Sequence, residues 1–332
     1  MAGRTGMPRD VRAWGPPPDT PSPPGRPGVP PPRPPLGPPP GWPPPPPGDV
    51  PVPNTRRHRR LRRFVRRLAL TLLILQLVLA VFLGILRLWT PGTTAFMLQD
   101  GTSVTYQYVS LDHVSRYLLA AVIAHEDERL GTRAGAFTLG DFTGRITAYL
   151  HGKPDPSGST IPQQLAKNVF LWPHQDPVRK GLEAVLSSEM SLTLSHQREL
   201  ELYVNYAQFG PHLYGICAAS WYYFGAPPYD VTQYQADQLM GVLPDPDLVT
   251  RAPGGGIDVG PGANPLAVNL INGAANVHVP RELAGMGGWR AAIATVGLHD
   301  TAADHASGRH DPDACSSPPP AVTDRLAHEG SS

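Results

Sequence analysis

The chain has 332 residues, and its 28 Lys and Arg nearly balance 27 Asp and Glu, giving a formal net charge of +1. This balance gives no support to functions based on whole-chain charge, such as nucleic-acid binding. Residues 1–54 contain 23 prolines and almost no apolar side chains. Because proline fixes φ and removes a backbone donor, we predict a disordered, partly polyproline II tail. Two functions stay open for it, a ligand for proline-reading domains and a plain spacer.

An arginine-rich segment at 55–67 precedes a long apolar run. Eight arginines lie between positions 56 and 67, and the nineteen uncharged residues LALTLLILQLVLAVFLGIL follow. At ~1.5 Å per residue this run spans ~28 Å, close to the ~30 Å of a hydrocarbon core. No small-residue cleavage site follows it, so we predict a retained single transmembrane helix at 68–89. The arginines orient the tail toward the cytoplasm and the rest of the chain outside.

The external part divides at about residue 255. Helical patterns with short loops fill 90–255, and SVTYQYV is the only convincing strand, so this domain is predicted to be mainly α. Residues 256–332 are rich in Gly, Ala and Pro and are predicted to be a tail, with one short helix near 287–296 and disorder after about 300. A disulfide between Cys217 and Cys315 is permitted outside the cytoplasm, but the sequence leaves the pairing open.

Two glutamates are candidates for chemistry. Glu126 ends an apolar helical stripe, where partial desolvation would raise its pKa toward the range of a general base. The competing interpretation is a solvated acid paired with Arg129. Glu183 lies four residues after Arg179 on one helix face, and taken alone this is an ordinary surface pair.

The stretch SGSTIPQQLAKN predicts a helix start. Thr160-x-x-Gln163 fits a capping box, and Pro162 falls in the first turn, where its missing N–H costs nothing. Gln163, Gln164 and Lys167 would then share a side near the helix N-terminus, an arrangement suited to a phosphate or pyrophosphate. An ordinary polar helix face is the alternative.

Five segments in order carry a family resemblance: AVIAHEDERL, SGSTIPQQLAKNVFLW, VRKGLEAVLSSE, ELELYVNYAQFGPHLYGICAASWYYFG and ADQLMGVLPDPDLVTRAP. Together they resemble the successive motifs of the family 51 peptidoglycan glycosyltransferases, over about residues 110–253. NVFLW with VRKGLEA is most similar to the monofunctional biosynthetic transglycosylases. No transpeptidase motif set is found after them.

The resemblance implies a lysozyme-like, mainly α domain that polymerises lipid II into β-1,4 glycan strands and releases undecaprenyl pyrophosphate. Glu126 would be the base, and Glu183 would lie along the pyrophosphate with Lys167, Arg179 and Lys180. These residues would assist departure of the pyrophosphate either directly or through a bridging divalent cation, Mg or Mn, and no organic cofactor is expected. The remaining residues of the donor site would be Ser159, Thr160, Gln163, Gln164 and Asn168. Asn205 and Gly210 would be structural, and residues 133–156 would form a mobile, membrane-dipping part over the groove.

The sequence departs from the family pattern at four positions. Leu130 and Arg133 stand where the first motif has Phe and His, and Ser157 and Pro162 stand where the second has Gly and Thr or Ser. They leave open a non-catalytic, membrane-tethered scaffold that binds lipid II, with the proline-rich tail recruiting cell-wall or division proteins. A lytic glycosidase is disfavoured, because cleavage has no use for pyrophosphate-binding cations.

Overall fold

The computed structural model describes residues 55–101, 104–151, 158–174, 176–299 and 309–330, together with Gly41. Contacts divide the chain into two units, Met1–Arg60 and Leu61–Ser332. The predicted proline-rich tail thus lies outside the described residues, apart from Gly41.

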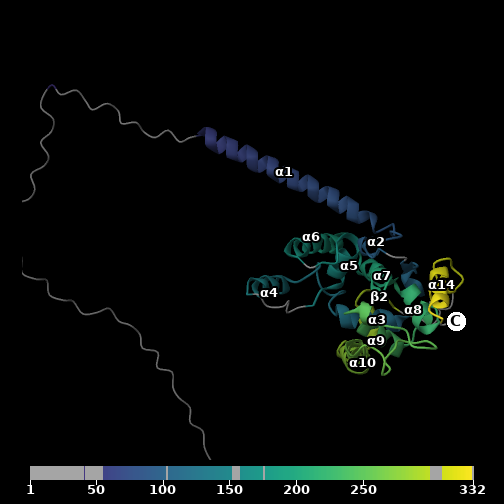
Figure 1. Cartoon of the computed structure of the whole chain (residues 1–332). Helices are drawn as coiled ribbons and strands as arrows, with labels where there is room; N and C mark the ends of the chain where they lie inside the picture. The colour runs from purple at the N-terminus through teal and green to yellow at the C-terminus, as the bar shows by residue number, and fades with distance from the viewer. Residues whose placement is uncertain are drawn as a thin grey trace, which may run out of the picture. The chain divides into compact units, whose positions relative to one another are not determined.

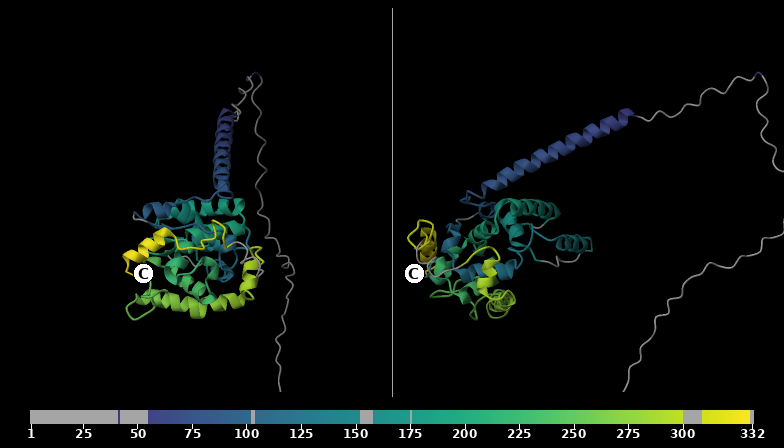
Figure 2. Two further views of the ribbon diagram at one scale, coloured as in Figure 1. Left: turned by 90° about the vertical axis from the view of Figure 1, so that its right-hand side faces the viewer. Right: turned by 180° about the vertical axis from the view of Figure 1, so that it is seen from behind.

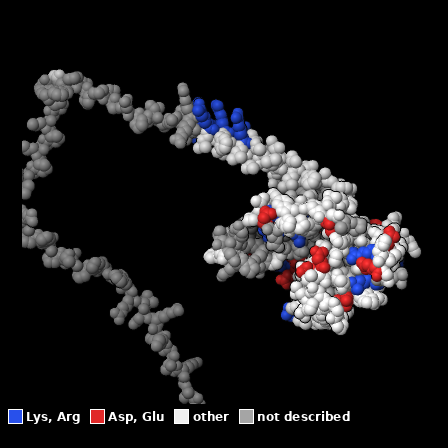
Figure 3. All heavy atoms as spheres, viewed as in Figure 1, with Lys and Arg blue, Asp and Glu red and all other residues white. Residues whose placement is uncertain are grey.

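The first helix, α1 (Thr55–Ile85), joins a basic start to an apolar stretch. Figure 3 shows its arginine side chains gathered near the N-terminal end, as the sequence requires. Among the described helices, only α1 is long and apolar enough to cross a membrane, over Arg59–Ile85. Leu83 and Leu86, at its end, are buried in a cluster with Leu165 and Met190. The predicted apolar helix is confirmed, and its passage through a membrane stays a prediction.

The domain after α1 is built mainly from helices (Figure 1), as predicted. Its first half contains α2 (Ala95–Gln99), β1 (Thr105–Tyr106), the 3₁₀ helix η1 (Leu111–His113), α3 (Arg116–Glu126), α4 (Leu139–Leu150), α5 (Ile161–Phe170), α6 (Pro177–Thr193) and α7 (His196–Tyr206). Its second half contains β2 (Gln208–Gly210), β3 (Leu213–Tyr214), α8 (Ile216–Phe224), η2 (Pro228–Asp230), α9 (Gln233–Val242), η3 (Pro246–Leu248), α10 (Pro265–Gly273), the π-helical η4 (Ala274–His278), α11 (Val279–Gly285), α12 (Trp289–Ala294) and α14 (Pro320–His328).

The described strands form one small sheet of order β1-β3-β2. β1 pairs in parallel with β3, through Thr105 with Leu213, and β2 pairs antiparallel to β3. β1 lies inside SVTYQYV, the stretch predicted to be a strand. The sheet is too short to set the architecture, so packing between helices does.

Helix α3 forms the centre of the main hydrophobic core. Every residue from Leu118 to Ala124 is buried, so α3 is covered on all sides and not only along the predicted stripe. A helix that is apolar all round is typical of a protein interior. Helices α9, α11 and α12 pack against it. Its last residue, Glu126, therefore emerges from the core at a fixed place.

The C-terminal helices correct the prediction of a tail from residue 256. α10, η4, α11 and α12 are folded onto α9 and α3 and bury Ile271, Val279, Leu283 and Ile293 in the main core. Small residues allow this close approach: a Cβ on Gly241 of α9 would lie 2.4 Å from the Cα of Ile271. The Gly and Ala content that resembled a tail is instead a packing surface.

A disulfide anchors the last described segment. Cys217 of α8 is bonded to Cys315, and the backbone carbonyl of Cys315 accepts a hydrogen bond from the Trp221 indole at 2.9 Å. Arg325 of α14 donates to the Pro211 carbonyl at 2.8 Å. The pairing that the sequence left open is thus present, and residues 309–330 are ordered although disorder was expected there. Residues 300–308 lie outside the described part.

Helix α4 occupies part of the segment predicted to lie over the groove, 133–156. In Figures 1 and 2 it projects from the rest of the domain. Residues 152–157 lie outside the described part, and the mobility of this segment stays a prediction.

Gly241→Ala should destabilise the domain by roughly 2 kcal/mol or more, because the added methyl overlaps the α10 backbone and overpacks the core. Gly181→Ala is the matched control, since nothing lies within 4 Å of a Cβ at that exposed helical position. The control should gain about 0.5–1 kcal/mol. Thermal unfolding of the detergent-solubilised protein measures both, and equal effects would contradict the packing of α10 on α9.

Candidate active site

Glu126 lies at the junction of α3 with the start of α5. Its Oε2 accepts a hydrogen bond of 2.6 Å from the Nε2 amide of Gln164. The carbonyl oxygen of the same amide accepts the Tyr203 hydroxyl at 3.1 Å, which fixes the orientation of the amide. Arg129, the alternative partner, pairs instead with Asp141 at 3.2 Å. The interpretation of Glu126 as a surface acid paired with Arg129 is therefore wrong.

Burial dominates the acidity of Glu126. Desolvation raises the pKa of this carboxyl, while the Gln164 hydrogen bond, the charge of His125, the Tyr203 hydroxyl and Lys167 act in the opposite direction and only in part offset it. A carboxylate with a raised pKa is a better base near neutral pH. This position thus has the acidity that proton abstraction from a hydroxyl requires.

Asp127, the next residue, ties the end of α3 to the start of α5. Its two oxygens accept hydrogen bonds from Arg133 at 2.6 and 2.8 Å, and one of them also accepts the backbone N–H of Ile161 at 3.2 Å. Arg133 donates in addition to the Gly135 carbonyl. Arg133, which stands where relatives have His, is consequently a buried structural partner of Asp127.

The predicted capping box at the start of α5 is confirmed. Gln163 Oε1 accepts the backbone N–H of Thr160 at 3.1 Å, and Pro162 lies in the first turn. Thr160 also donates its hydroxyl to the Ala136 carbonyl at 2.9 Å. These bonds direct Gln163 to the cap and Gln164 to Glu126. Gln163, Gln164 and Lys167 were predicted to face one anion together. The described hydrogen bonds instead direct the two glutamines to different partners.

Three cations, Lys167 of α5 and Arg179 and Lys180 of α6, lie around the carboxylate of Glu183 and are called the cation group below. Lys180 Nζ lies 2.6 Å from Glu183 Oε1 and 3.4 Å from the Ser159 hydroxyl, and Arg179 Nη1 lies 3.9 Å from Glu183 Oε2. The side chains of Arg179 and Glu183 are only 5% and 2% exposed, so the interpretation as a surface pair is wrong. The predicted residues Ser159, Arg179, Lys180 and Glu183 are therefore brought together.

Lys167 links the cation group to Glu126. Burial is the main cause that lowers the pKa of its ammonium, Arg179 and Lys180 lower it further, and Glu183 and Glu126 raise it. The ammonium also lies 5.4 Å from the centre of the Phe96 ring. Lys167 thus lies within electrostatic reach of both carboxylates.

Arg179 carries unsatisfied donors in this group. Its Nε and Nη1 atoms are buried and have no hydrogen-bond partner among the described residues. A buried donor without a partner costs free energy unless a ligand satisfies it. With Lys167 and Lys180 beside it, the guanidinium has the charge and the free donors that suit an anion with several oxygens, and pyrophosphate binding here stays a prediction.

The predicted divalent cation lacks a matching set of ligands. At the cation group the chain offers one carboxylate, Glu183, whose oxygens already face Lys180 and Arg179. Over the described ranges, the one set of three His, Asp or Glu side chains close enough to share an ion is His113, Asp311 and Asp313, which belong to η1 and the C-terminal segment. The described residues of the site therefore do not hold a metal by themselves. A cation that bridges a bound pyrophosphate stays a prediction, and we assign no step to it.

Three further predicted residues support the backbone around the site. Asn168 is buried, and its amide lies 3.4 Å from the Tyr206 carbonyl. Asn205 bonds both the N–H and the carbonyl of Val109 at 2.9 Å. A Cβ on Gly210 would lie 2.7 Å from the Tyr223 hydroxyl. The described bond of Asn168 is to the backbone and not toward the donor site. The contacts of Asn205 and Gly210 agree with the structural function expected for them.

Sequence reasoning missed the groups that surround Glu126. Tyr203 is fully buried and holds Gln164, and His125 Nδ1 lies 2.8 Å from Glu282 Oε2 of α11. Asp237 of α9 is buried near His125, and burial raises its pKa to about 7. Tyr203 lies within a quoted motif and could have been found there. Glu282 lies beyond every motif, and no pattern in the sequence points to it.

Two other departures from the family pattern, Leu130 and Pro162, are among the described residues, and each has a structural explanation. Leu130 is 1% exposed and belongs to the main core. Pro162 is accommodated in the first turn of α5. Ser157 lies outside the described residues. None of the described departures removes an acid, base or cation of the site.

Comparison with known proteins identifies the family. The family profile described as Transglycosylase matches residues 94–254. A biosynthetic peptidoglycan transglycosylase of Marinomonas sp. is 38% identical over 173 residues, which are 51% of this chain and 75% of the relative. The chain belongs to the transglycosylase family. Transglycosylases of the same name from Shewanella frigidimarina and Shewanella amazonensis are 38% and 36% identical and are covered over 69% and 76% of their length.

Membership of the transglycosylase family confirms the predicted lysozyme-like, mainly α fold and the resemblance on which the site residues were chosen. The matched region ends at residue 254, so α10, α11, α12 and α14 lie beyond it. Glu282 of α11, which contacts His125 beside Glu126, therefore lies outside the matched region.

Arg133→Met should destabilise the domain by roughly 3–5 kcal/mol, because it leaves the buried charge of Asp127 without its partner. The double variant Asp127→Asn with Arg133→Met should recover much of this loss, since no unpaired charge remains. Denaturant unfolding of the solubilised protein measures both. A single variant as stable as the wild type would contradict the structural function of this pair.

Proposed function

We propose that this chain polymerises lipid II into peptidoglycan glycan strands and releases undecaprenyl pyrophosphate. One arrangement carries the proposal: a buried base, Glu126, lies within electrostatic reach of Lys167, which belongs to a cation group with unsatisfied donors. A base and a pyrophosphate site side by side are what transfer from a lipid pyrophosphate requires. The family and its named relatives support the same reaction class.

Glu126 acts on the acceptor. Its carboxylate takes the proton of the 4-hydroxyl as that oxygen forms a bond to C1 of the donor sugar. Gln164 holds the carboxylate through its 2.6 Å hydrogen bond, and Tyr203 holds Gln164. The acceptor oxygen and the base are then kept in one geometry, which lowers the entropic part of the barrier.

The cations act on the donor. As the bond from C1 to the phosphate oxygen breaks, its electron pair and negative charge pass to the pyrophosphate. Lys167, Arg179 and Lys180 stabilise this charge, and their positions are fixed before the reaction by Glu183 and by burial. Attack from the face opposite the leaving group inverts the anomeric centre and gives a β-1,4 linkage.

A location at the membrane follows from α1 and is supported by α6. The arginine-rich start of α1 orients a single-pass protein with its N-terminus inside and the catalytic domain outside. On α6 the side chains of Val178, Leu182, Val185 and Leu192 are exposed, which suits contact with lipid beside a lipid-linked substrate. Partners of the proline-rich tail among cell-wall or division proteins are part of this proposal.

The deciding experiment incubates the detergent-solubilised full chain with labelled lipid II, with and without divalent cation. Wild type should form polymer, and Glu126→Gln should form none, because the amide cannot take a proton. Glu128→Gln is the matched control, since Glu128 is exposed and should leave activity unchanged. Lipid II binding without polymer in the wild type would overturn the proposal in favour of the scaffold. Shortening of preformed glycan would indicate a lytic enzyme.

The pH profile provides an independent check on the base. As pH falls, kcat/KM should decrease with a midpoint above the ordinary pKa of a glutamate. Activity needs the deprotonated form, and burial raises the pKa of Glu126. Gln164→Leu removes a hydrogen bond to that charged form, so the pKa should rise further and the midpoint should move to higher pH.

Gln197→Leu, at an exposed position whose amide bonds the Gly297 carbonyl, is the control and should leave the midpoint in place. A midpoint that stays fixed or moves to lower pH in Gln164→Leu would contradict the assignment of Glu126 as the base.

A further inference from the structure

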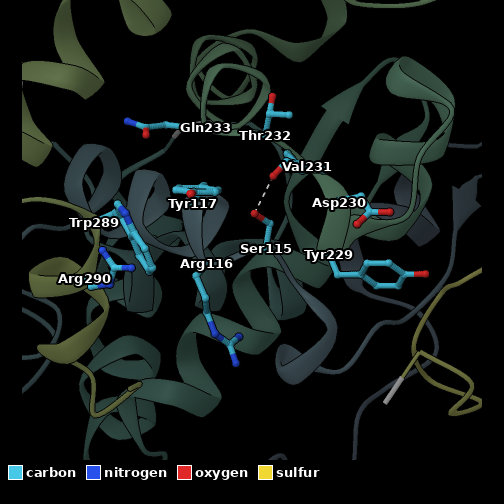
Figure 4. Close-up of a pocket in the computed structure, with 10 residues that line it drawn as sticks. All are labelled: Ser115, Arg116, Tyr117, Tyr229, Asp230, Val231, Thr232, Gln233, Trp289 and Arg290. Atoms are coloured by element: carbon cyan, nitrogen blue, oxygen red, sulfur yellow. Dashed lines mark hydrogen bonds between the residues drawn. The ribbon is translucent and has the colours of Figure 1, made fainter. Parts of the chain in front are cut away.

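A second pocket lies at the opposite end of α3 from Glu126, a distance of ~15 Å along the helix axis. Its volume is about 630 Å³, and Figure 4 shows the side chains that line it. They come from three places: the start of α3, the segment from η2 to the start of α9, and the start of α12. The Ser115 hydroxyl bonds the Val231 carbonyl at 2.7 Å, and both residues are buried. This buried hydrogen bond therefore holds the floor of the pocket in place.

An aromatic corner forms one wall. The rings of Tyr117 and Trp289 meet edge to face, with centroids 5.2 Å apart and planes at 63°. Tyr117 is 38% exposed although it lies on the otherwise buried α3. Arg290 stacks over the indole of Trp289 at 4.3 Å. Stacking of this kind holds the guanidinium in place at low entropic cost.

Planar polar groups form the rest of the rim. Gln233 and Asp230 are exposed at the pocket, and Asp230 lies 3.8 Å from Arg309. No carboxylate pairs with Arg290 within the part of the chain that the structure describes. The pocket thus offers an apolar face, amide and carboxylate groups, and one cation that is available to an anion.

We propose that this pocket binds a segment of carboxylate-bearing glycan strand, a site separate from the reaction centre. A hexosamine ring has a flat face of C–H groups that stacks on an aromatic ring, and hydroxyl and acetamido groups at its edge that bond planar polar side chains. Arg290 would take the carboxylate of a muramyl unit that has lost its stem peptide, because in the intact unit this carboxyl is amide-linked to the peptide. The identity of the ligand rests on the proposed function, because the chain must meet glycan outside the membrane.

Two observations separate this pocket from the pyrophosphate site. Arg290 is a single exposed cation, whereas the site on α5 and α6 combines three cations with buried donors. Trp289 and Arg290 also lie beyond residue 254, where the family match ends. The pocket therefore combines residues of the matched region with a wall from α12 that lies outside it.

The test measures co-sedimentation of the detergent-solubilised full chain with three probes: intact peptidoglycan sacculi, glycan strands stripped of peptide, and the free stem peptide. Stripped glycan should bind wild type, intact sacculi should bind less because most of their muramyl carboxyls carry stem peptides, and the free peptide should not bind. Arg290→Ala and Gln233→Ala should each weaken glycan binding about tenfold, or ~1.4 kcal/mol. Trp289→Ala should weaken it further, but its ring is part of the core, so the two exposed variants carry the test.

Arg281→Ala is the matched control, an exposed arginine on the neighbouring α11 that should bind like wild type. Glu126→Gln should also bind like wild type, so glycan binding can be scored even if polymerisation is never observed. Unchanged binding in Arg290→Ala and Gln233→Ala would overturn the proposal. Binding of the free peptide alone would overturn it in favour of a peptide-reading site.

Discussion

The carboxylate of Asp127 is the constraint on which the site depends. It joins two helices whose adjoining residues are 34 positions apart in sequence, because it accepts the N–H of Ile161 while it is held by Arg133. This junction holds the start of α5 against the end of α3, and so it places the Gln164 amide 2.6 Å from the Glu126 carboxylate. Arginine suits the task, since its planar fork bonds both oxygens at once and remains charged when buried.

The cation group costs folding free energy, because it holds buried donors and charges without full hydrogen bonding. Arg179 is buried with two nitrogen atoms unpartnered among the described residues, and Lys167 is buried enough that its pKa falls. A domain selected for stability alone would not keep such groups together, because each loses hydration without full compensation. Glu183 relieves part of the repulsion and leaves a net positive charge. In the proposed reaction this positive charge would be in place before the leaving group develops its negative charge, which is how fixed cations stabilise a transition state.

Sequence reasoning recovered the parts of the molecule that follow from local chemistry. The apolar helix, the capping box at Thr160 and the placement of Glu126 depend on residues near one another in the chain, and the structure agrees with each. The direction of Gln164 could not be recovered, because its partner Glu126 lies on another helix, α3, 38 positions earlier in the chain. Arg133 was identified as a departure, but its partner is clear only once α3 and α5 are placed.

Most of the C-terminal helices were missed for a different reason, although the short helix expected near 287–296 is present as α12 (Trp289–Ala294). Their Gly and Ala content is typical of tails, yet Ala267, Ala274 and Ala292 are buried in the main core, where small side chains allow close helix contacts. A glycine of the first half allows a similar contact, because a Cβ on Gly131 would lie 2.1 Å from the Thr295 carbonyl oxygen. These helices complete the burial of α3, and Glu282 among them holds His125 beside Glu126. The charge of His125 and the burial of α3 both act on the pKa of Glu126. The residues that set the acidity of the base therefore extend past the boundary of the family match, and the folding unit is larger than the region by which the family is recognised.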